Sequence, residues 1–240
     1  MKMFAALLVG LTFLVSPLHA ASEDWVPIKG GTFLMKTSRD MESEPVTVKP
    51  FMLFRTLVTE AQYEECVNSG GCTEPDTDGF KSGSCNFRMY GRENDPVNCV
   101  TWEQANAYAL WKAAIPGFEG ARLPSESEWV FAATDGGKNE RLGASCDVGS
   151  AAGSHACGNG GTVPVCTYAD WSVRVDEGRE LCDMVGNVWQ WVRRLQPDEA
   201  FQVLRGGSFY PKRGGYDAAV HRYVVAATDR FGDYGFRLAR

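Results

Sequence analysis

The side chains in this 240-residue sequence with the widest range of chemistry are its eight cysteines. Cysteines can ligate zinc, join as disulfides or act as nucleophiles. Their number is even, and no two of them have the Cys-x-x-Cys spacing of a zinc knuckle. We therefore expect disulfides rather than a zinc site, although many pairings are open. Nearest-neighbour pairing would close four short loops, Cys66–Cys72, Cys85–Cys99, Cys146–Cys157 and Cys166–Cys182.

Histidines and paired carboxylates offer less chemistry. One of the three histidines lies in the first twenty residues, and the two that remain are too few for a three-histidine metal site. Glu126 and Glu128 could act as an acid–base pair, but both lie in the first turn of a predicted helix, where negative charge is favourable. We expect both to be structural. We also expect Arg122 and Arg205 to hold buried carboxylates or carbonyls.

Composition and charge exclude several classes of protein. With 44% hydrophobic and 22% charged residues, the chain can bury a core, which excludes a disordered protein. The 30 acidic residues outnumber the 24 basic ones, and the isoelectric point is near 5.2. The chain therefore lacks the positive field that attracts phosphate backbones, and we expect no nucleic-acid partner.

The first twenty residues have the pattern of an export signal. A lysine precedes an apolar run over residues 3–15, and Pro17 and Ala20 resemble a cleavage region. The run is shorter than the roughly 20 apolar residues that span a membrane. We expect residues 1–20 to be a signal peptide, the protein to be secreted or periplasmic, and no stable membrane insertion. No linker or repeat divides residues 21–240, which predicts a single domain.

Three helix starts are recognisable because each has the residues of a capping box. Thr59, Thr101 and Ser125 are each followed three residues later by Gln or Glu. In that motif the hydroxyl accepts from the N3 amide, and the N3 side chain accepts from the cap amide. Glycine and proline clusters mark the helix ends. The sequence predicts short helices over residues 60–68, 102–114 and 126–134.

β-branched and aromatic residues, which are typical of strands, gather in short stretches. These stretches are residues 25–28, 32–35, 46–54, 203–205 and 236–239. Residues 136–180 show no periodicity, which indicates a functional surface or a coil held by disulfides. Short helices, few strands and long coil predict an irregular α+β fold.

The same landmarks carry a resemblance to a known family. Seven motifs follow one another in order: Trp25–Met35, Val58–Tyr63, Pro96–Ala105, Arg122–Trp129, Asp183–Trp191, Leu204–Phe209 and Gly235–Arg237. In sequence and spacing they resemble the formylglycine-generating enzyme, or sulfatase-modifying factor, family over residues 25–240. The resemblance implies a compact, irregular α+β domain of C-type-lectin-like architecture, with short helices, small antiparallel sheets and much coil.

The resemblance also shows what this chain lacks. In family members that oxidise a sulfatase cysteine to formylglycine, two cysteines follow the Gly-Gly-Ser motif and bind copper as thiolates. Counting from Ser208, Pro211 and Tyr216 occupy those two positions, and no cysteine follows Cys182. Neither side chain can ligate copper through sulfur. We therefore assign no catalytic residue and expect no formylglycine-generating activity and neither copper nor iron.

One ligand set of the family maps onto this chain. In family members, the DMxGNxWEW-type segment binds Ca²⁺ through side chains at its first and eighth positions and carbonyls at its fourth and sixth. The resemblance implies calcium ligands at Asp183, Gly186, Val188 and Gln190. Gln190 replaces the usual glutamate, so Ca²⁺ should bind more weakly or not at all. The alternative is a structural turn, with Asn187 bonded to the backbone and Trp189 and Trp191 packed in or near the core.

The family's binding groove lies beside the segment between the Gly-Gly-Ser and Gly-Phe-Arg motifs. The resemblance implies a ligand-binding surface at Tyr210, Arg213, Tyr216, His221 and Arg222. Tyrosine and arginine are common in recognition surfaces. The alternative is that these rings only cover the core beneath a long connection.

Two functions remain open for this chain. The first is an exported, disulfide-stabilised recognition or accessory domain without chemistry of its own, which would bind a protein, a peptide or a small ligand. The second is a periplasmic oxidoreductase similar to the family branch that is needed for pyoverdine maturation and does not rely on the cysteine pair. The content of redox metal separates the two hypotheses.

Overall fold

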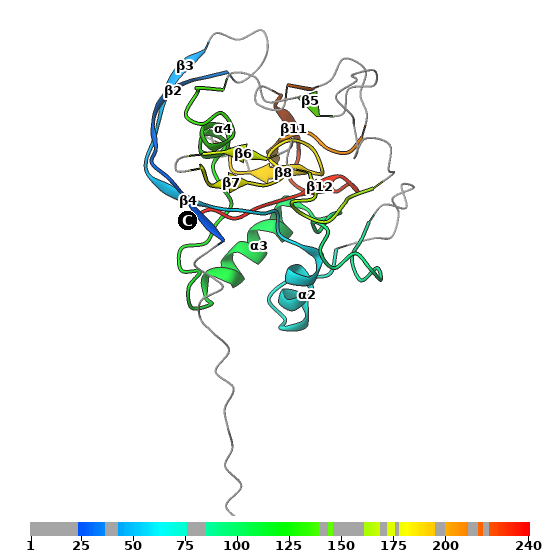
Figure 1. Cartoon of the computed structure of the whole chain (residues 1–240). Helices are drawn as coiled ribbons and strands as arrows, with labels where there is room; N and C mark the ends of the chain where they lie inside the picture. Colours follow the sequence, from blue (N-terminus) through cyan, green and yellow to red (C-terminus); the bar gives the residue numbers. More distant parts are fainter. Residues whose placement is uncertain are drawn as a thin grey trace, which may run out of the picture.

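The structure is a computed structural model in which three short helices and several small sheets surround a four-stranded sheet (Figure 1). It describes residues 24–36, 43–75, 85–139, 144–145, 161–168, 172–175, 178–194, 200–210, 216–217 and 221–240. Statements about the fold refer to these ranges. The irregular α+β architecture predicted from the sequence is confirmed.

The three helices begin where the capping boxes predict. They are α2 (Glu60–Asn68), α3 (Trp102–Ala113) and α4 (Glu126–Ala133). In each of them the cap hydroxyl accepts from the N3 amide, and the N3 side chain accepts from the cap amide. These bonds satisfy two of the amides that a helix start leaves unpaired. α3 and α4 each end one residue earlier than predicted.

Short strands make up the other regular elements. They are β1 (Trp25–Ile28), β2 (Gly31–Met35), β3 (Glu44–Val48), β4 (Phe51–Phe54), β5 (Ala144–Ser145), β6 (Val173–Arg174), β7 (Glu180–Leu181), β8 (Trp189–Val192), β9 (Phe201–Arg205), β10 (Tyr216–Asp217), β11 (Tyr223–Ala226) and β12 (Tyr234–Gly235). Four antiparallel pairs, β1–β4, β2–β3, β5–β10 and β6–β7, surround the four-stranded sheet.

The prediction of one strand over residues 46–54 is wrong. The stretch divides into β3, which pairs with β2, and β4, which pairs with β1. Lys49 and Pro50 separate the two strands, and proline has no N–H to donate to a ladder. The chain therefore changes its partner strand at this point.

Residues 236–239, predicted as a strand, run beside β4 but do not form a regular ladder. The Phe54 N–H donates to the Leu238 carbonyl at 2.8 Å, and the Ala239 N–H donates to the Arg122 carbonyl at 2.7 Å. The backbone thus alternates between two neighbours, and only isolated bridges form. This run joins β4 to the segment that precedes α4.

The four-stranded sheet, in the order β11-β9-β8-β12, separates two buried clusters of side chains. Trp191 and Leu204, opposite each other on β8 and β9, pack with residues of α2 and α3. Val192 and Val203, the next pair, pack with residues of α4. Because successive side chains of a strand point to opposite faces, the sheet has an α3 face and an α4 face. In Figure 1, α4 lies above this sheet and α3 below it.

Disulfides join the coil segments to this framework. The structure contains Cys66–Cys72, Cys85–Cys99 and Cys166–Cys182, as nearest-neighbour pairing predicts. The fourth expected pair, Cys146–Cys157, lies outside the described residues. Among the helices that the structure describes, none is long and apolar enough to cross a membrane.

Candidate functional site

A layer of buried polar side chains lies between α4 and the central sheet. Gln190 on β8 and Arg205 on β9 are opposite each other in register, and both are fully buried. α4 contributes Trp129 and Glu126, which are also buried. Water does not reach such groups, so each of them needs a hydrogen-bond partner within the protein.

The side-chain amide of Gln190 is hydrogen-bonded on both sides. Its Oε1 accepts from Trp129 Nε1–H at 2.8 Å and from Arg237 Nε–H at 2.7 Å. Its Nε2 donates to the carbonyl oxygen of Asp183 at 2.8 Å. An amide oxygen has two lone pairs, so these two donors saturate Oε1. Gln190 thereby links α4, the run after β12 and the turn before β8.

Arg237 is a fully buried cation. Its Nη1 donates to the carbonyl oxygens of Phe54 and Arg55, each at 3.2 Å. Its Nη2 donates to the carbonyl oxygens of Cys182 at 2.6 Å and Asp183 at 3.1 Å. Burial lowers the pKa of this guanidinium to about 10, against the raising effect of Asp183, so it remains protonated at neutral pH. The guanidinium holds β4 against the segment that leads into β8.

Asp183 begins the turn before β8, with a φ of 52°. Its carboxylate is buried, and Oδ2 accepts from the Cys166 N–H at 2.9 Å. Oδ1 has no hydrogen-bond partner among the described residues. Burial raises the pKa of this carboxyl, while the Cys166 amide, the nearby Arg237 and the Asn187 side chain lower it in part.

The turn from Asp183 to Gln190 has the features of the structural alternative. The Asn187 side chain makes two hydrogen bonds to the backbone of Val163. Its Nδ2–H donates to the Val163 carbonyl at 3.1 Å, and its Oδ1 accepts from the Val163 N–H at 3.4 Å. Trp189 and Trp191 are buried. Asn187 also adopts the left-handed conformation, with a φ of 60°.

The residues implied as calcium ligands lie together in this turn but do not fit a hard cation as they are arranged. Ca²⁺ takes about 6–8 oxygen ligands, typically with several carboxylates. Asp183 supplies a carboxylate, and Gly186 and Val188 have only backbone oxygens to offer. Gln190 has an oxygen that two donors already saturate, and an N–H group that faces the turn.

Glu126 holds two guanidinium groups with a single oxygen. Its Oε1 accepts from Arg205 at 2.6 Å and 3.1 Å, and from Arg222 Nε–H at 2.6 Å. Arg205 and Glu126 are buried, whereas the Arg222 side chain is 22% exposed. Glu128 completes the cap of α4 and bonds Arg122 at 2.7 Å. Both glutamates thus make the structural contacts predicted for them, and Arg205 holds a buried carboxylate as predicted. The carboxylate that Arg122 holds, that of Glu128, is only partly buried.

Aromatic rings extend from the α3 face of the sheet to the surface. The rings of His221 and Tyr223 lie 6.0 Å and 5.8 Å from that of Trp189. Tyr234 lies 6.4 Å from Tyr223 and 5.0 Å from Phe231. Trp189 and Tyr234 are buried, whereas Tyr223 is 44% and Phe231 40% exposed. We call these five residues the ring cluster.

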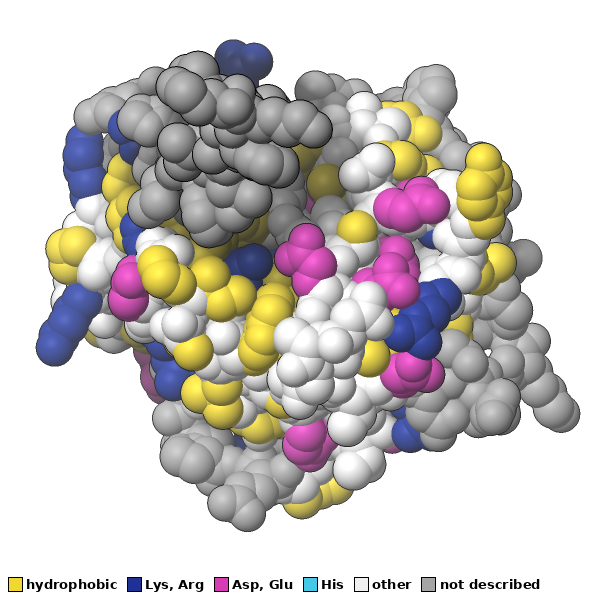
Figure 2. Space-filling view, turned by 90° about the horizontal axis from the view of Figure 1, so that it is seen from below, with side chains coloured by type: hydrophobic (Ala, Val, Ile, Leu, Met, Phe, Trp, Pro, Cys, Tyr) yellow, Lys and Arg dark blue, Asp and Glu magenta, His cyan; other side chains and the backbone are white. Residues whose placement is uncertain are grey.

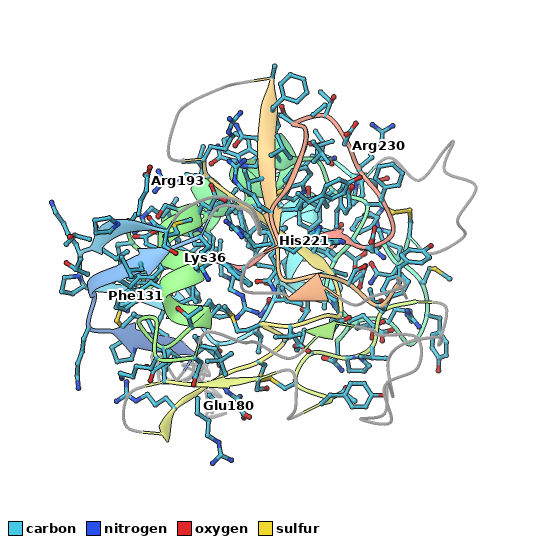
Figure 3. The ribbon with its side chains drawn as sticks, turned by 90° about the horizontal axis from the view of Figure 1, so that it is seen from above. Lys36, Phe131, Glu180, Arg193, His221 and Arg230 are labelled. Carbon is cyan, nitrogen blue, oxygen red and sulfur yellow. A yellow bond between two sulfur atoms is a disulfide. The ribbon has the colours of Figure 1, made fainter. Side chains whose placement is uncertain are left out.

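The structure divides the expected ligand surface. His221 belongs to the ring cluster and lies near the middle of the face seen from above (Figure 3). The neighbouring Arg222 reaches α4 instead. Tyr210 is 44% exposed. Tyr216 has its backbone in β10, while its side chain and all of Arg213 lie outside the described residues.

On the face seen from below, Asp and Glu lie among Lys, Arg and apolar side chains (Figure 2). Within the described ranges, no three His, Cys, Asp or Glu residues are grouped so that they could hold a metal ion. Tyr223 and Phe231 of the ring cluster are among the large apolar side chains that this part of the chain exposes.

Comparison with protein families identifies this architecture. The family model described as the sulfatase-modifying factor enzyme 1-like domain (FGE-sulfatase) matches residues 14–240. The chain belongs to this family. The resemblance predicted from the seven motifs is thereby confirmed.

The chain is similar in sequence to two curated relatives and in fold to one solved structure. The formylglycine-generating enzyme of Streptomyces coelicolor is 32% identical over 186 residues, which cover 62% of this chain and 54% of that enzyme. The inactive Cα-formylglycine-generating enzyme 2 of Bos taurus is 32% identical over 151 residues, which cover 58% and 45%. The chain thus spans about half the length of these relatives. The structure of PvdO from Pseudomonas aeruginosa has a TM-score of 0.71 at 22% identity and covers 90% of this chain and 93% of that one.

Trp129 and Arg237 were not assigned a role at the site from the sequence. Both belong to motifs that carry the family resemblance, and that was the available signal. Their shared contact, Gln190, is 61 residues from Trp129 and 47 from Arg237. No local pattern could predict which side chain they meet.

Replacing the buried carboxylate in Glu126→Gln should strongly destabilise the fold. Arg205 and Arg222 would lose their shared anion, and breaking a buried ion pair typically costs about 3–5 kcal/mol. Glu103→Gln, at the exposed first turn of α3, is the matched control and should change the free energy of unfolding by about 0.5 kcal/mol or less. Urea denaturation measures both values, and equal losses would contradict the role given to Glu126.

Asp233 should make the stability pH-dependent. Its carboxylate is buried and accepts from Ser208 Oγ–H at 2.7 Å, and burial raises its pKa more than this bond lowers it. The folded protein therefore holds the proton more tightly than the unfolded chain, so the contribution of Asp233 falls as the pH rises through its folded pKa. Asp233→Asn removes this dependence. The free energy of unfolding of the variant minus that of the wild type should be larger at pH 7 than at pH 4 in urea denaturation. A pH-independent difference would contradict the assignment.

Proposed function

We propose that this protein is an exported, disulfide-stabilised recognition or accessory domain without redox chemistry of its own. The observation that carries the proposal is that Pro211 and Tyr216 stand at the positions where the copper-binding members of the family have cysteines. The cysteines that the structure describes are all joined in disulfides, so none of them offers a free thiolate.

Export is supported by the amino-terminal sequence and by the disulfides. A charged start, an apolar run over residues 3–15 and a small-residue region match a secretion signal. Disulfides persist in oxidising compartments such as the periplasm and the extracellular space. A secreted or periplasmic protein accounts for both features.

Recognition is supported by the ring cluster. Tyr223 and Phe231 present large exposed rings that rest on buried Trp189 and Tyr234. Rings supported in this way lose little conformational entropy when a partner covers them. That a fold of this family can lack catalytic function is supported by relatives named inactive, from Bos taurus and Mus musculus.

A second candidate, a periplasmic oxidoreductase of the pyoverdine-maturation type, is favoured by one observation. β10 pairs with β5, and this pairing sets Tyr216 opposite Ser145. The next residue in the sequence is Cys146, which lies outside the described residues. Tyr216 is a position where the copper-binding members have a cysteine, so a sulfur-based redox function would draw on Cys146 and Cys157 rather than on the usual pair.

Metal loading distinguishes these two functions. After anaerobic incubation with Cu(I) or Fe(II) and desalting, the wild type, Cys146→Ser/Cys157→Ser and the control Cys66→Ser/Cys72→Ser should all be free of retained metal by elemental analysis. Near-stoichiometric copper or iron that is lost in Cys146→Ser/Cys157→Ser but kept in the control would overturn the proposal in favour of the oxidoreductase.

A direct assay covers formylglycine generation. The wild type incubated with a Cys-x-Pro-x-Arg peptide, copper and oxygen should form no product with the mass of the aldehyde. A loss of mass that matches conversion of the cysteine to the aldehyde would also overturn the proposal.

A further inference from the structure

The turn from Asp183 to Gln190 is where the family resemblance implies a calcium ion, and Gln190 is where this chain departs from the family pattern. A glutamine could simply be a weaker oxygen ligand in the same site. Alternatively, its side-chain amide could take the place of the ion. The hydrogen bonds around the amide distinguish these two possibilities.

The orientation of the Gln190 amide is determined by its neighbours. Trp129 Nε1–H and Arg237 Nε–H both donate to the same atom, at 2.8 Å and 2.7 Å. Neither an indole nor a guanidinium can accept a hydrogen bond, so the atom that faces them must be the amide oxygen. With two donors this oxygen has no lone pair left for a cation.

Nε2 of Gln190 consequently faces the turn. It donates to the Asp183 carbonyl at 2.8 Å, and Arg237 Nη2 donates to the same carbonyl at 3.1 Å. In family members with glutamate, the eighth position directs an anionic oxygen toward the ion. Here an N–H group, with its partial positive charge, takes that place and would repel a cation.

The buried charges near the turn also disfavour a bound calcium ion. Arg237 is fully buried, and Asp183 is the acid whose charge acts on it. Their opposite charges balance, and the amide of Gln190 adds none. Glu180, whose charge also acts on Asp183, is partly exposed and lies 3.8 Å from the Arg55 guanidinium. A divalent ion beside Asp183 and Arg237 would therefore bring two further positive charges into a buried region without a second buried carboxylate, which is strongly unfavourable.

The amide also fits closely against the neighbouring strand. Gly206, directly after β9, has a φ of 98°, and a Cβ there would lie 3.0 Å from Nε2 of Gln190. The Gly186 N–H donates to the Gly206 carbonyl at 2.9 Å. The turn is therefore held against β9 by bonds and packing that come from the protein alone.

We infer that the side-chain amide of Gln190 replaces the calcium ion of the family, so that the turn from Asp183 to Gln190 folds without a metal. The single change Gln190→Glu should convert the turn to a calcium-binding one. Asp183 Oδ1, which has no hydrogen-bond partner among the described residues, would then be joined by a second carboxylate.

Thermal unfolding with and without Ca²⁺ tests the inference. The wild type, treated with EGTA and then melted in EGTA, in excess Ca²⁺ or in excess Mg²⁺, should keep the same Tm within about 1 °C and should give no heat of Ca²⁺ binding by calorimetry. Gln190→Glu should melt below the wild type in EGTA and should gain about 5 °C or more at saturating Ca²⁺. Mg²⁺ should not replace Ca²⁺ in this variant, because it prefers a smaller, octahedral site.

Gln62→Glu is the matched control, since it makes the same chemical change at the capping box of α2, where a carboxylate can accept the same bond as an amide. It should show no response to Ca²⁺. A wild type that loses Tm on chelation and regains it with Ca²⁺ would overturn the inference, and this measurement does not depend on any variant folding. A folded Gln190→Glu variant without a Ca²⁺ response would also overturn it.

Discussion

The Gln190 amide and the Arg237 guanidinium meet between α4 and the central sheet, where neither can reach water. Each hydrogen bond left unmade there would cost about 1–3 kcal/mol, more than its formation contributes. Trp129, the Asp183 carbonyl and the β4 carbonyl of Phe54 must therefore all be in place together. This requirement sets the positions of α4, β4 and β8 relative to one another.

A second polar contact supports the same interface nearer its edge. Glu126 sits at the start of α4 and joins Arg205 on β9 to Arg222, just before β11. A buried ion pair contributes little net stability compared with apolar packing. The ion pair instead favours one alignment of β9 and α4, because a shift of either element by one residue would leave a buried charge without its partner.

Local patterns predicted the parts of the fold that depend on neighbouring residues. The capping boxes at Thr59, Thr101 and Ser125 gave the helix starts because a cap needs only a residue and its third neighbour. Short cysteine spacings gave the three disulfides that the structure describes for the same reason. The seven motifs of the family resemblance predicted the fold class.

Predictions failed where distant residues decide the outcome. The stretch over residues 46–54 reads as one strand, but its two halves pair with different strands, which no short window contains. His221 and Arg222 were predicted to lie on one surface. The His221 ring instead lies beside that of Trp189, whereas Arg222 donates a hydrogen bond to Glu126. The bonds that orient Gln190 come from residues 47 and 61 positions away. These hydrogen bonds could not be predicted from the presence of glutamine where the family has glutamate.

The run over residues 236–240 has a consequence for how the molecule unfolds. Arg237 donates a hydrogen bond to the carbonyl of Phe54, 183 positions earlier. The carbonyls of Phe236 and Leu238 accept hydrogen bonds from the backbone N–H groups of Val58 and Phe54, respectively. Leu238 belongs to one buried cluster and Ala239 to the other. Chain closure over such a separation is slow, and peeling this run away would open both clusters at once. Denaturation should accordingly proceed as a single cooperative step, without a stable half-folded species.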